Sequence, residues 1–322
     1  RESETKYRGL FESIDSGYCV IEVLFDDHGQ PVDYVFLETN PAFIVHTGLA
    51  DAIGKRVREL APTHEDFWFR TYGRIARTGV PERFEHRADA LDRWYNVYAF
   101  RIGDPGQHRV AILFEDIKER KLRELGAAFL DELGQQLEPL SDPDEIMQVA
   151  GERICAFFGV SGCVLCDVDE ARNQVTVQHG WTAPSVPSLR QTFQLDDYLT
   201  EDFARTNRAG ENFLVRDTDL DPRTDAKAYA LLRIRAFVVV PFVSEGHWKA
   251  SYAITSERAR EWRADEVALL KELSERLFLR VERARAGVAL QADFGAVQRS
   301  RDDVGGARAA KDRVLAVLSD EL

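Results

Sequence analysis

The chain changes from a strand pattern to a helix pattern within residues 109–137, RVAILFEDIKERKLRELGAAFLDELGQQL. Arg109–Phe114 is a short apolar run of the kind that favours a buried strand. From Glu115 to Leu137 the apolar residues recur at three- and four-residue steps, a spacing that predicts one continuous helix. Its apolar stripe consists of Leu122, Leu125, Phe129, Leu133 and Leu137. We therefore expect a sheet to end here and a connecting helix over 115–138 to carry the chain onward.

Before this junction, alternating and β-branched patterns predict four further strands and two helices. The strands fall at 17–25, 32–37, 82–87 and 93–102, and the helices near 40–43 and at 64–78. A turn at Asp26–Gly29 joins the first two strands as a hairpin, and Asn40 followed by Pro41 is a typical helix start. Two strands, short helices and then three strands predict a five-stranded antiparallel sheet with helices on one face, an α+β domain.

Beyond the junction, the patterns predict a second α+β domain of about the same type. Ser141-Asp142-Pro143 begins a helix that ends before Gly159, because glycine favours helix ends. Two strand pairs are predicted, 160–168 with 175–181 and 236–243 with 248–255. Between them lie predicted helices at 196–208 and 226–233 and a short strand at 213–215.

The last predicted helix begins at Ala264 and carries apolar residues at near-heptad spacing. Such spacing is typical of a coiled-coil seam and predicts a parallel homodimer. The seam residues are Leu270, Leu273, Leu277, Val281, Ala284 and Val288. The predicted fold class is thus α+β, with two antiparallel-sheet domains joined and followed by long helices that form a dimeric coiled coil.

Composition limits the classes of function. The 322 residues, 44% of them hydrophobic, suffice for two domains with cores of their own. A net charge of −13 disfavours nucleic acid and anionic membranes as partners, and no apolar run reaches the roughly 20 residues that span a bilayer. Cys163 and Cys166 stand in an apolar run, so we expect buried, reduced thiols and a cytoplasmic location. The sequence has no metal-ligand spacing and no phosphate-binding glycine loop, and it requires no cofactor.

Four segments within residues 4–121 resemble the PAS domains of bacterial sensor kinases. They are YRGLFESI (7–14), ETNPAF (38–43), WYNVY (94–98) and FEDIKERK (114–121). PAS domains commonly leave their last strand through an Asp-Ile-Thr turn. Asp116 and Ile117 match this turn, whereas Lys118 replaces the threonine and removes its hydroxyl. The resemblance implies that these three residues transmit the signal to the helix that follows.

The second domain resembles a GAF domain. The segments that carry the resemblance are VRD (215–217), DPR (221–223), IRAFVVVPF (234–242) and WKASYA (248–253). The C-terminal stretch AKDRVLAVLSDEL (310–322) is similar to the phosphoacceptor motif of histidine kinases. In that motif a histidine precedes the glutamate, and here Asp320 stands in its place before Glu321. The aspartate is either an engineered substitution or a naturally degenerate acceptor, and its carboxylate cannot imitate a phosphorylated imidazole.

These resemblances imply the sensory input module of a two-component sensor histidine kinase. Its parts are a PAS-like domain (1–121), the connecting helix (115–138), a GAF-like domain (139–285) and a C-terminal helix (264–322) that leads into the dimerisation and phosphoacceptor region. The parent would be a protein-histidine kinase with a response regulator as partner. The alternatives are a different output, such as a cyclic-dinucleotide enzyme or a phosphatase, a pure interaction module, and a bilin or flavin photoreceptor. Photoreception is less favoured because the flavin-binding Asn-Cys-Arg-Phe segment is absent and Cys19 lies within a predicted strand.

Both domain types commonly bind small molecules between sheet and helices, so a small-molecule ligand is expected. In the first domain the candidate cavity residues are Tyr18, Phe36, Asn40, Phe43, Phe69, Trp94 and Tyr98. In the second domain they are Cys166, Trp181, Phe237, Tyr252 and Ile254. Aromatic residues at such spacings are more often plain core than ligand sites. Neither the ligand nor the domain that senses it follows from the sequence.

Overall fold

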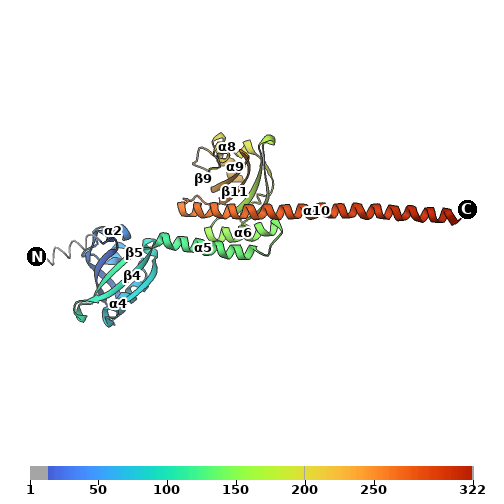
Figure 1. Cartoon of the computed structure of the whole chain (residues 1–322). Helices are drawn as coiled ribbons and strands as arrows, with labels where there is room; N and C mark the ends of the chain where they lie inside the picture. The colour runs from blue at the N-terminus through green and yellow to red at the C-terminus, as the bar shows by residue number, and fades with distance from the viewer. Residues whose placement is uncertain (1–13, 199, 321–322) are drawn as a thin grey trace. The chain divides into compact units, whose positions relative to one another are not determined.

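A computed structural model describes residues 14–198 and 200–320, with side chains as far as residue 294 (Figure 1). The chain divides into two compact units, and the boundary falls between Leu125 and Gly126. This boundary lies within helix α5 (Lys118–Leu137), which therefore contributes residues to both units.

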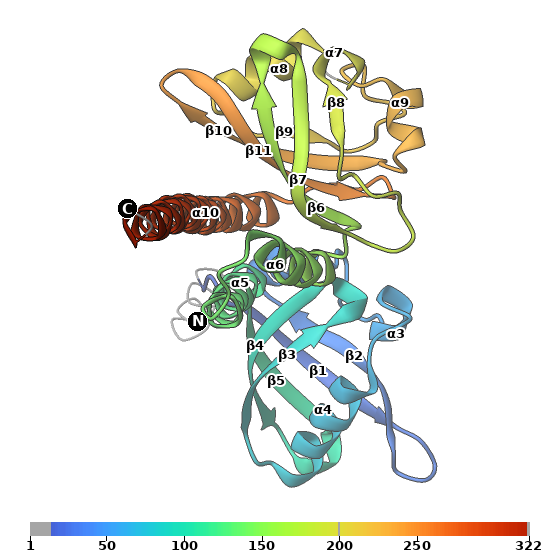
Figure 2. The same ribbon diagram turned by 90° about the vertical axis from the view of Figure 1, so that its right-hand side faces the viewer.

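The first unit is built on a five-stranded antiparallel sheet in the order β2-β1-β5-β4-β3. Its strands are β1 (Gly17–Phe25), β2 (Pro31–Thr39), β3 (Glu82–Ala88), β4 (Arg93–Ile102) and β5 (Arg109–Asp116). Helices α2 (Pro41–Thr47), α3 (Val57–Leu60) and α4 (Asp66–Thr78) pack on one face of the sheet, and Figure 2 shows α3 and α4 there. Single 3-10 turns precede the last two strands, η1 (Asp89–Leu91) and η2 (Pro105–Gln107). The predicted α+β sheet is confirmed.

The core of the first unit lies between this sheet face and the helices. Strand alternation sends Ile21 of β1 and Val97 of β4 into it. Helix α4 contributes a fully buried stripe that includes Phe69 and Ile75. The helix can approach the sheet edge closely because position 73 is glycine, where a Cβ atom would stand 2.6 Å from that of Pro31.

The junction between strand and helix lies two to three residues later than the sequence pattern predicted. Strand β5 continues to Asp116, which pairs with Tyr95, and Glu115 pairs with Asn96. The backbone N–H of Ile117 then donates to the carbonyl oxygen of Trp94 at 2.7 Å. Because these ladder bonds hold 115 and 116 in the sheet, the helix begins at Lys118 and not at Glu115. It ends at Leu137, as predicted.

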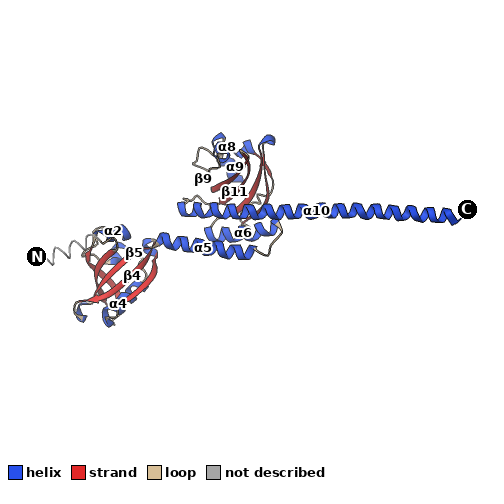
Figure 3. Ribbon diagram, viewed as in Figure 1, coloured by secondary structure: helices blue, strands red, loops and turns tan. Residues whose placement is uncertain are grey.

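The second unit has a six-stranded antiparallel sheet in the order β8-β7-β6-β11-β10-β9. The strands are β6 (Gly162–Asp169), β7 (Gln174–Thr182), β8 (Thr192–Gln194), β9 (Phe213–Val215), β10 (Ala236–Ser244) and β11 (His247–Ser256), with the 3-10 turn η3 (Glu170–Arg172) between the first two. The helices are α6 (Pro143–Phe158), α7 (Leu195–Tyr198), α8 (Glu201–Arg208), α9 (Ala226–Leu231) and α10 (Ala264–Asp320). Figure 3 separates the strands from the helices by colour.

Two predictions for this unit need correction. The helix predicted over 196–208 is two helices, because the side chain of Thr200 accepts from the backbone N–H of Phe203 and starts α8 anew. Strand β8 was not predicted, since three residues are too few to show an alternating pattern. The two hairpins and the cap of α6 by Asp142 are confirmed.

The sheet of the second unit is covered on both faces. One face packs against α6, α10 and the part of α5 that follows Gly126, and Tyr252 and Ile254 of β11 point to this helical layer. The other face packs under α8 and α9, and Trp248 and Ala253 of the same strand point there. A sheet buried on both faces accounts for the nearly unbroken apolar run of β10.

The residues predicted to form a dimer seam lie in this helical layer. Five of them, Leu270, Leu273, Leu277, Val281 and Ala284, are buried against their own domain. Val288 remains 49% exposed. Heptad spacing reveals an apolar stripe but not what covers it, and here α5, α6 and the sheet cover it. The homodimer itself stays a prediction, and these five side chains are not free to form it.

Candidate functional site

The first unit holds a cavity of about 50 Å³ between its sheet and helices. Two of the residues expected to line a cavity do so, Phe36 of β2 and Phe43 of α2. The remaining lining includes aromatic and titratable residues that were not among the candidate cavity residues, namely Cys19, Tyr34, His64, Trp68, Tyr72 and Tyr95. Tyr34 lies edge-on to Phe36, with ring centroids 5.4 Å apart.

A buried histidine is the main polar group in this cavity wall. The Nε2 atom of His64 is hydrogen-bonded to the Tyr34 hydroxyl at 3.1 Å, and the side chain is only 4% exposed. Its Nδ1 atom has no hydrogen-bond partner. Burial lowers the pKa of His64 to about 4; Glu65 opposes this shift and Arg58 adds to it. The imidazole is therefore neutral at pH 7.

The other expected residues of the first unit lie elsewhere. In β4 the inward face carries Tyr95, Val97 and Ala99, so Trp94 and Tyr98 point away from the cavity. Tyr98 is 37% exposed. Alternation separates the two faces of a strand but does not say which is inward. The polar Asn96, on the same face as Trp94 and Tyr98, was the signal that this face lies outside.

Asn40, Tyr18 and Phe69 do not line the cavity either. The Oδ1 atom of Asn40 accepts from the backbone N–H groups of Phe43 at 3.0 Å and Tyr18 at 2.9 Å, so this side chain caps α2 and joins it to β1. Tyr18 is half-buried, and Phe69 is buried in the core with the Arg58 guanidinium over its ring.

The second unit holds a larger cavity of about 120 Å³, between the sheet and helices α7 to α9. Of the candidate residues named from the sequence, Cys166 of β6 and Phe237 of β10 line it. Trp181, Tyr252 and Ile254 lie on the opposite, helical side of the sheet. There the Tyr252 hydroxyl contacts the sulfur of Met147 at 2.9 Å, and Trp181 packs on α6 at Gly151.

The wall of the second cavity is apolar and uncharged. None of its lining residues carries a formal charge at pH 7. The hydroxyl of Tyr229 donates to the carbonyl oxygen of Tyr198 at 3.3 Å, and the indole N–H of Trp248 donates to Oγ of Ser251 at 2.7 Å. Burial raises the pKa of Cys166 to about 12, so its thiol is protonated and neutral. The cavity therefore offers apolar contact and no charge.

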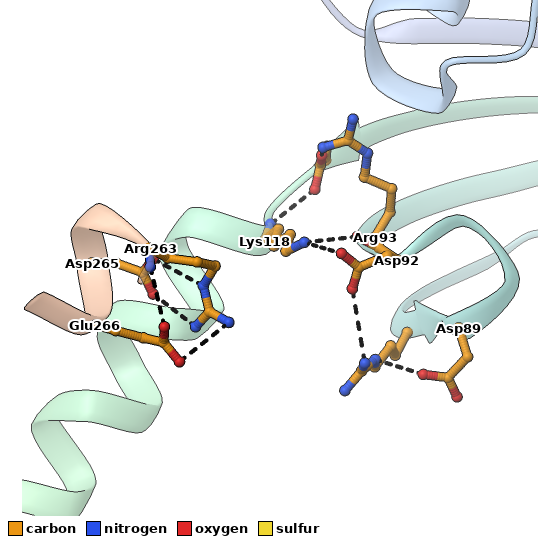
Figure 4. Close-up of polar contacts among 9 residues, drawn as sticks. Asp89, Asp92, Arg93, Lys118, Arg263, Asp265 and Glu266 are labelled. Atoms are coloured by element: carbon orange, nitrogen blue, oxygen red, sulfur yellow. Dashed lines mark hydrogen bonds and ion pairs between the residues drawn. The ribbon is translucent and has the colours of Figure 1, made fainter. Parts of the chain in front are cut away.

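The turn that leads into α5 contains the three residues expected to transmit a signal, and Figure 4 shows one of them, Lys118, beside Asp92. The Asp116 carboxylate accepts the backbone N–H of Lys118 at 2.9 Å and pairs with Arg93 at 2.9 Å. Ile117 is buried. The Lys118 ammonium donates to the carbonyl oxygen of Asp92 at 3.1 Å and forms an ion pair with its carboxylate. The aspartate thus retains an N–H partner and an arginine in the absence of a threonine hydroxyl.

His46 joins this turn to the start of β1. Its Nδ1 atom accepts the backbone N–H of Asp116 at 3.1 Å, and its Nε2 atom donates to the carbonyl oxygen of Asp15 at 2.8 Å. These two roles fix the neutral tautomer with the proton on Nε2. No sequence pattern indicated that this histidine contacts the helix junction.

The start of α10 is held by a second polar cluster, within the second unit (Figure 4). The backbone N–H of Arg263 donates to the Glu266 carboxylate at 3.2 Å, and its guanidinium pairs with Asp265 at 3.1 Å. Arg260 pairs with the buried Glu266 at 2.9 Å. The indole N–H of Trp262 donates to the carbonyl oxygen of Val215 in β9 at 2.9 Å. This cluster ties the helix start to the sheet.

Further along α10, two arginines tie the helix to its own domain. Arg285 pairs with Asp167 of β6 at 2.9 Å. Arg280 donates to the carbonyl oxygen of Leu137 at the end of α5, where exposed carbonyl groups favour a cation. Of the expected phosphoacceptor residues, Asp320 is the last residue of the α10 backbone, its side chain lying outside the described part of the chain, and Glu321 lies outside the described residues altogether.

Within 14–198 and 200–294, no group of three or more His, Cys, Asp or Glu side chains is arranged to hold a metal ion. The four cysteines are buried free thiols, as expected for Cys163 and Cys166. Among the helices described, none is both long and apolar enough to cross a membrane.

The second unit is thus an α+β domain with a sheet between two helical layers and a cavity on one side. Residues 141–277 match the GAF domain family, and this part of the chain is a GAF domain. No curated protein matches the chain.

Several solved structures are similar to the chain. The free methionine-R-sulfoxide reductase of Neisseria meningitidis is 18% identical, with 51% of this chain and 92% of that one covered and a TM-score of 0.41. The GAF domain of a phosphoenolpyruvate-protein phosphotransferase from Coxiella burnetii is 15% identical, with coverage of 51% and 96% and a TM-score of 0.42. A bacteriophytochrome from R. palustris is 10% identical, with coverage of 85% and 59% and a TM-score of 0.43.

Proposed function

We propose that this chain is the sensory input module of a two-component sensor histidine kinase, with a PAS domain before the GAF domain. The observation that carries the proposal is the direct exit of the GAF sheet into α10, a helix of 57 residues that leaves the last strand through a fixed polar cluster. The antiparallel order β2-β1-β5-β4-β3 and the Asp116–Arg93 turn support the PAS assignment. The similarity of 310–322 to a phosphoacceptor motif supports the kinase parent and a response regulator as its partner.

The proposed signal path runs from the cavity of the GAF domain to α10 through β6 and β11. Cys166 of β6 lines the cavity, and the adjacent Asp167 pairs with Arg285 of α10. In β11, Ala253 faces the cavity while Tyr252 and Ile254 pack in the layer that contains α10. A ligand that changes the spacing of these strands would favour one position of α10 over another.

The homodimer is part of this proposal, with an interface that differs from the buried seam. Leu279, Leu290 and Phe294 are each at least 70% exposed on α10. Exposed leucine and phenylalanine side chains along one long helix are typical of a surface that a second copy covers. We propose that two chains associate in parallel through this part of α10.

Analytical ultracentrifugation of single variants tests the interface. Leu290→Asp is expected to shift the dimer to monomer without loss of fold, because this side chain is 71% exposed. Ala289→Asp introduces the same charge at a neighbouring exposed alanine and serves as the control. Leu273→Asp is expected to unfold the second unit instead, because it places a charge in the core. A wild-type chain that stays monomeric at micromolar concentration would contradict the dimer and, with it, this signalling mechanism.

A bilin or flavin photoreceptor receives no support from the cavities. Pockets for drug-sized ligands measure about 300–1,000 Å³, and the two cavities measure about 50 and 120 Å³. Cys19 is buried in the first, where burial raises the pKa of its thiol. A different output domain, such as a cyclic-dinucleotide enzyme or a phosphatase, fits the same sensory module. A measurement of phosphate transfer from ATP to the parent protein would distinguish a kinase from a cyclic-dinucleotide enzyme or a phosphatase.

A further inference from the structure

The volumes and walls of the two cavities differ enough to assign a ligand to one of them. A water molecule occupies roughly 30 Å³ of liquid, so the cavity of about 50 Å³ in the first unit has room for one or two waters beside His64 and Tyr34. The GAF cavity of about 120 Å³ approaches the roughly 150 Å³ at which an apolar protein cavity stays dry and takes up benzene. Of these two cavities between sheet and helices, the GAF cavity is therefore the one with room for an organic molecule.

The wall of the GAF cavity excludes charged ligands. An anion such as a nucleotide phosphate loses its hydration on burial and needs charged or N–H partners in return. No charged side chain lines this cavity, and its Tyr229 hydroxyl and Trp248 indole N–H already have partners. A buried cation would meet the same uncompensated loss of hydration. Neutral molecules are the class that this wall accepts.

The aromatic side chains of the wall favour a ring. Tyr198 lies edge-on to Phe193, with centroids 5.2 Å apart, and edge-on to Tyr229 at 6.0 Å. Phe193 and Tyr198 are half-buried and Tyr229 is buried, so the aromatic group extends from the surface to the interior. Faces and edges at these spacings interact favourably with a further aromatic ring.

We propose that the GAF cavity binds a neutral, single-ring aromatic molecule between β6, β11 and the helices α7 to α9. This inference rests on the proposed sensory function and gives the chemical class of its ligand. A ring seated there would contact Cys166 and Ala253, which lie on the two strands that lead to α10. The ligand site and the proposed signal path would then share these strands.

The experiment uses the full chain with fluorobenzene as the probe and follows its ¹⁹F NMR signal. We expect saturable binding to the wild type. Ala253→Leu fills the cavity and is expected to weaken binding by about tenfold or more. Lys249→Leu places the same side chain on an exposed position of the same strand and should bind like the wild type. If Ala253→Leu does not fold, Ala253→Val, which adds a smaller side chain to the cavity, replaces it in the binding measurement. Absence of saturable binding, or equal binding to the filled variant, would overturn the proposal.

Two charged probes complete the test. Tetramethylammonium and cyclic AMP are expected not to bind, and binding of either in place of fluorobenzene would refute the ligand class. Hydrogen exchange at the start of α10 separates this inference from the proposed function. If fluorobenzene binds and α10 exchange does not change, the cavity assignment stands and the signalling proposal fails. If cyclic AMP alone binds and changes hydrogen exchange at the start of α10, the signalling proposal stands and the proposed ligand class fails.

Discussion

Acidification should destabilise the first unit through one side chain, His64. Its side chain is 4% exposed, and its Nδ1 atom has no hydrogen-bond partner, the Glu65 carboxylate being 3.5 Å away. Burial lowers its pKa from 6.5 to about 4, with Glu65 opposing the shift, Arg58 adding to it and Asp33 opposing it. Between these two pKa values the unfolded chain binds a proton that the folded chain does not. The contribution of the neutral His64 side chain to the free energy of unfolding is therefore fully present above pH 6.5, and it is lost as the pH falls toward 4.

The magnitude follows from the two pKa values. At pH 5 nearly all of the unfolded imidazole is protonated and about a tenth of the folded imidazole, which corresponds to a loss of about 2 kcal/mol relative to pH 7. Glu65 stays ionised in this window. Burial raises its pKa, but hydrogen bonds from backbone N–H groups, that of Ala90 among them, and the charge of His64 together lower it. The change between pH 7 and 5 is thus assigned to His64.

Hydrogen exchange read by mass spectrometry is the appropriate assay, because peptides from β1 and β5 report on the first unit alone. After correction for intrinsic exchange, we expect their opening free energy to fall by about 2 kcal/mol from pH 7 to 5. His64→Gln keeps a partner for the Tyr34 hydroxyl and does not titrate, so most of this fall should vanish. His28→Gln alters an exposed histidine and is the control. An equal fall in the wild type and in His64→Gln would refute the reasoning.

Two further predictions concern the helices. In α6, Gly151→Ala should lower the thermal stability of the second unit by about 1–2 kcal/mol, because a Cβ atom would stand 2.4 Å from that of Trp181 and this overpacking exceeds the gain in helix propensity. In α5, a Cβ atom added at Gly134 would have no atom within 4 Å, so Gly134→Ala should raise the stability of the second unit by up to about 1 kcal/mol. A loss of stability in Gly134→Ala would contradict the explanation by overpacking at Gly151. At the turn that leads into α5, Asp116→Ala should lower the free energy of unfolding of the first unit by about 1–3 kcal/mol and speed hydrogen exchange at the start of α5. Lys118→Ala removes an ion pair to an exposed carboxylate and should lower it by at most about 1 kcal/mol. Equal effects of the last two variants would show that the aspartate does not anchor the helix.

Most of the fold could be predicted because its signals are local. Strand alternation and the cap at Asp142 each depend on neighbouring residues, and the structure confirms both. The predicted stripe of α5 is confirmed only in its second half, where Phe129, Leu133 and Leu137 are buried. In its first half, Leu125 is 50% exposed. The errors arose where longer-range contacts decide. Strand β5 reaches Asp116 because its partner β4 provides ladder bonds there. The break between α7 and α8 depends on whether Thr200 turns back to cap α8, which helical periodicity does not reveal.

The candidate sites were harder to predict, because a cavity depends on which face of each strand is inward and on what covers it. Tyr252 and Ala253 are adjacent in β11, yet one packs under α6 and α10 and the other lines the GAF cavity. Since this sheet is buried on both faces, both residues belong to apolar patterns and the sequence cannot separate cavity from core. The same ambiguity explains why the apolar stripe of α10 was predicted to form a dimer seam, although five of its residues pack within their own domain. A stripe that covers its own sheet and a stripe that meets a second chain have the same spacing, and only the position of the sheet distinguishes them.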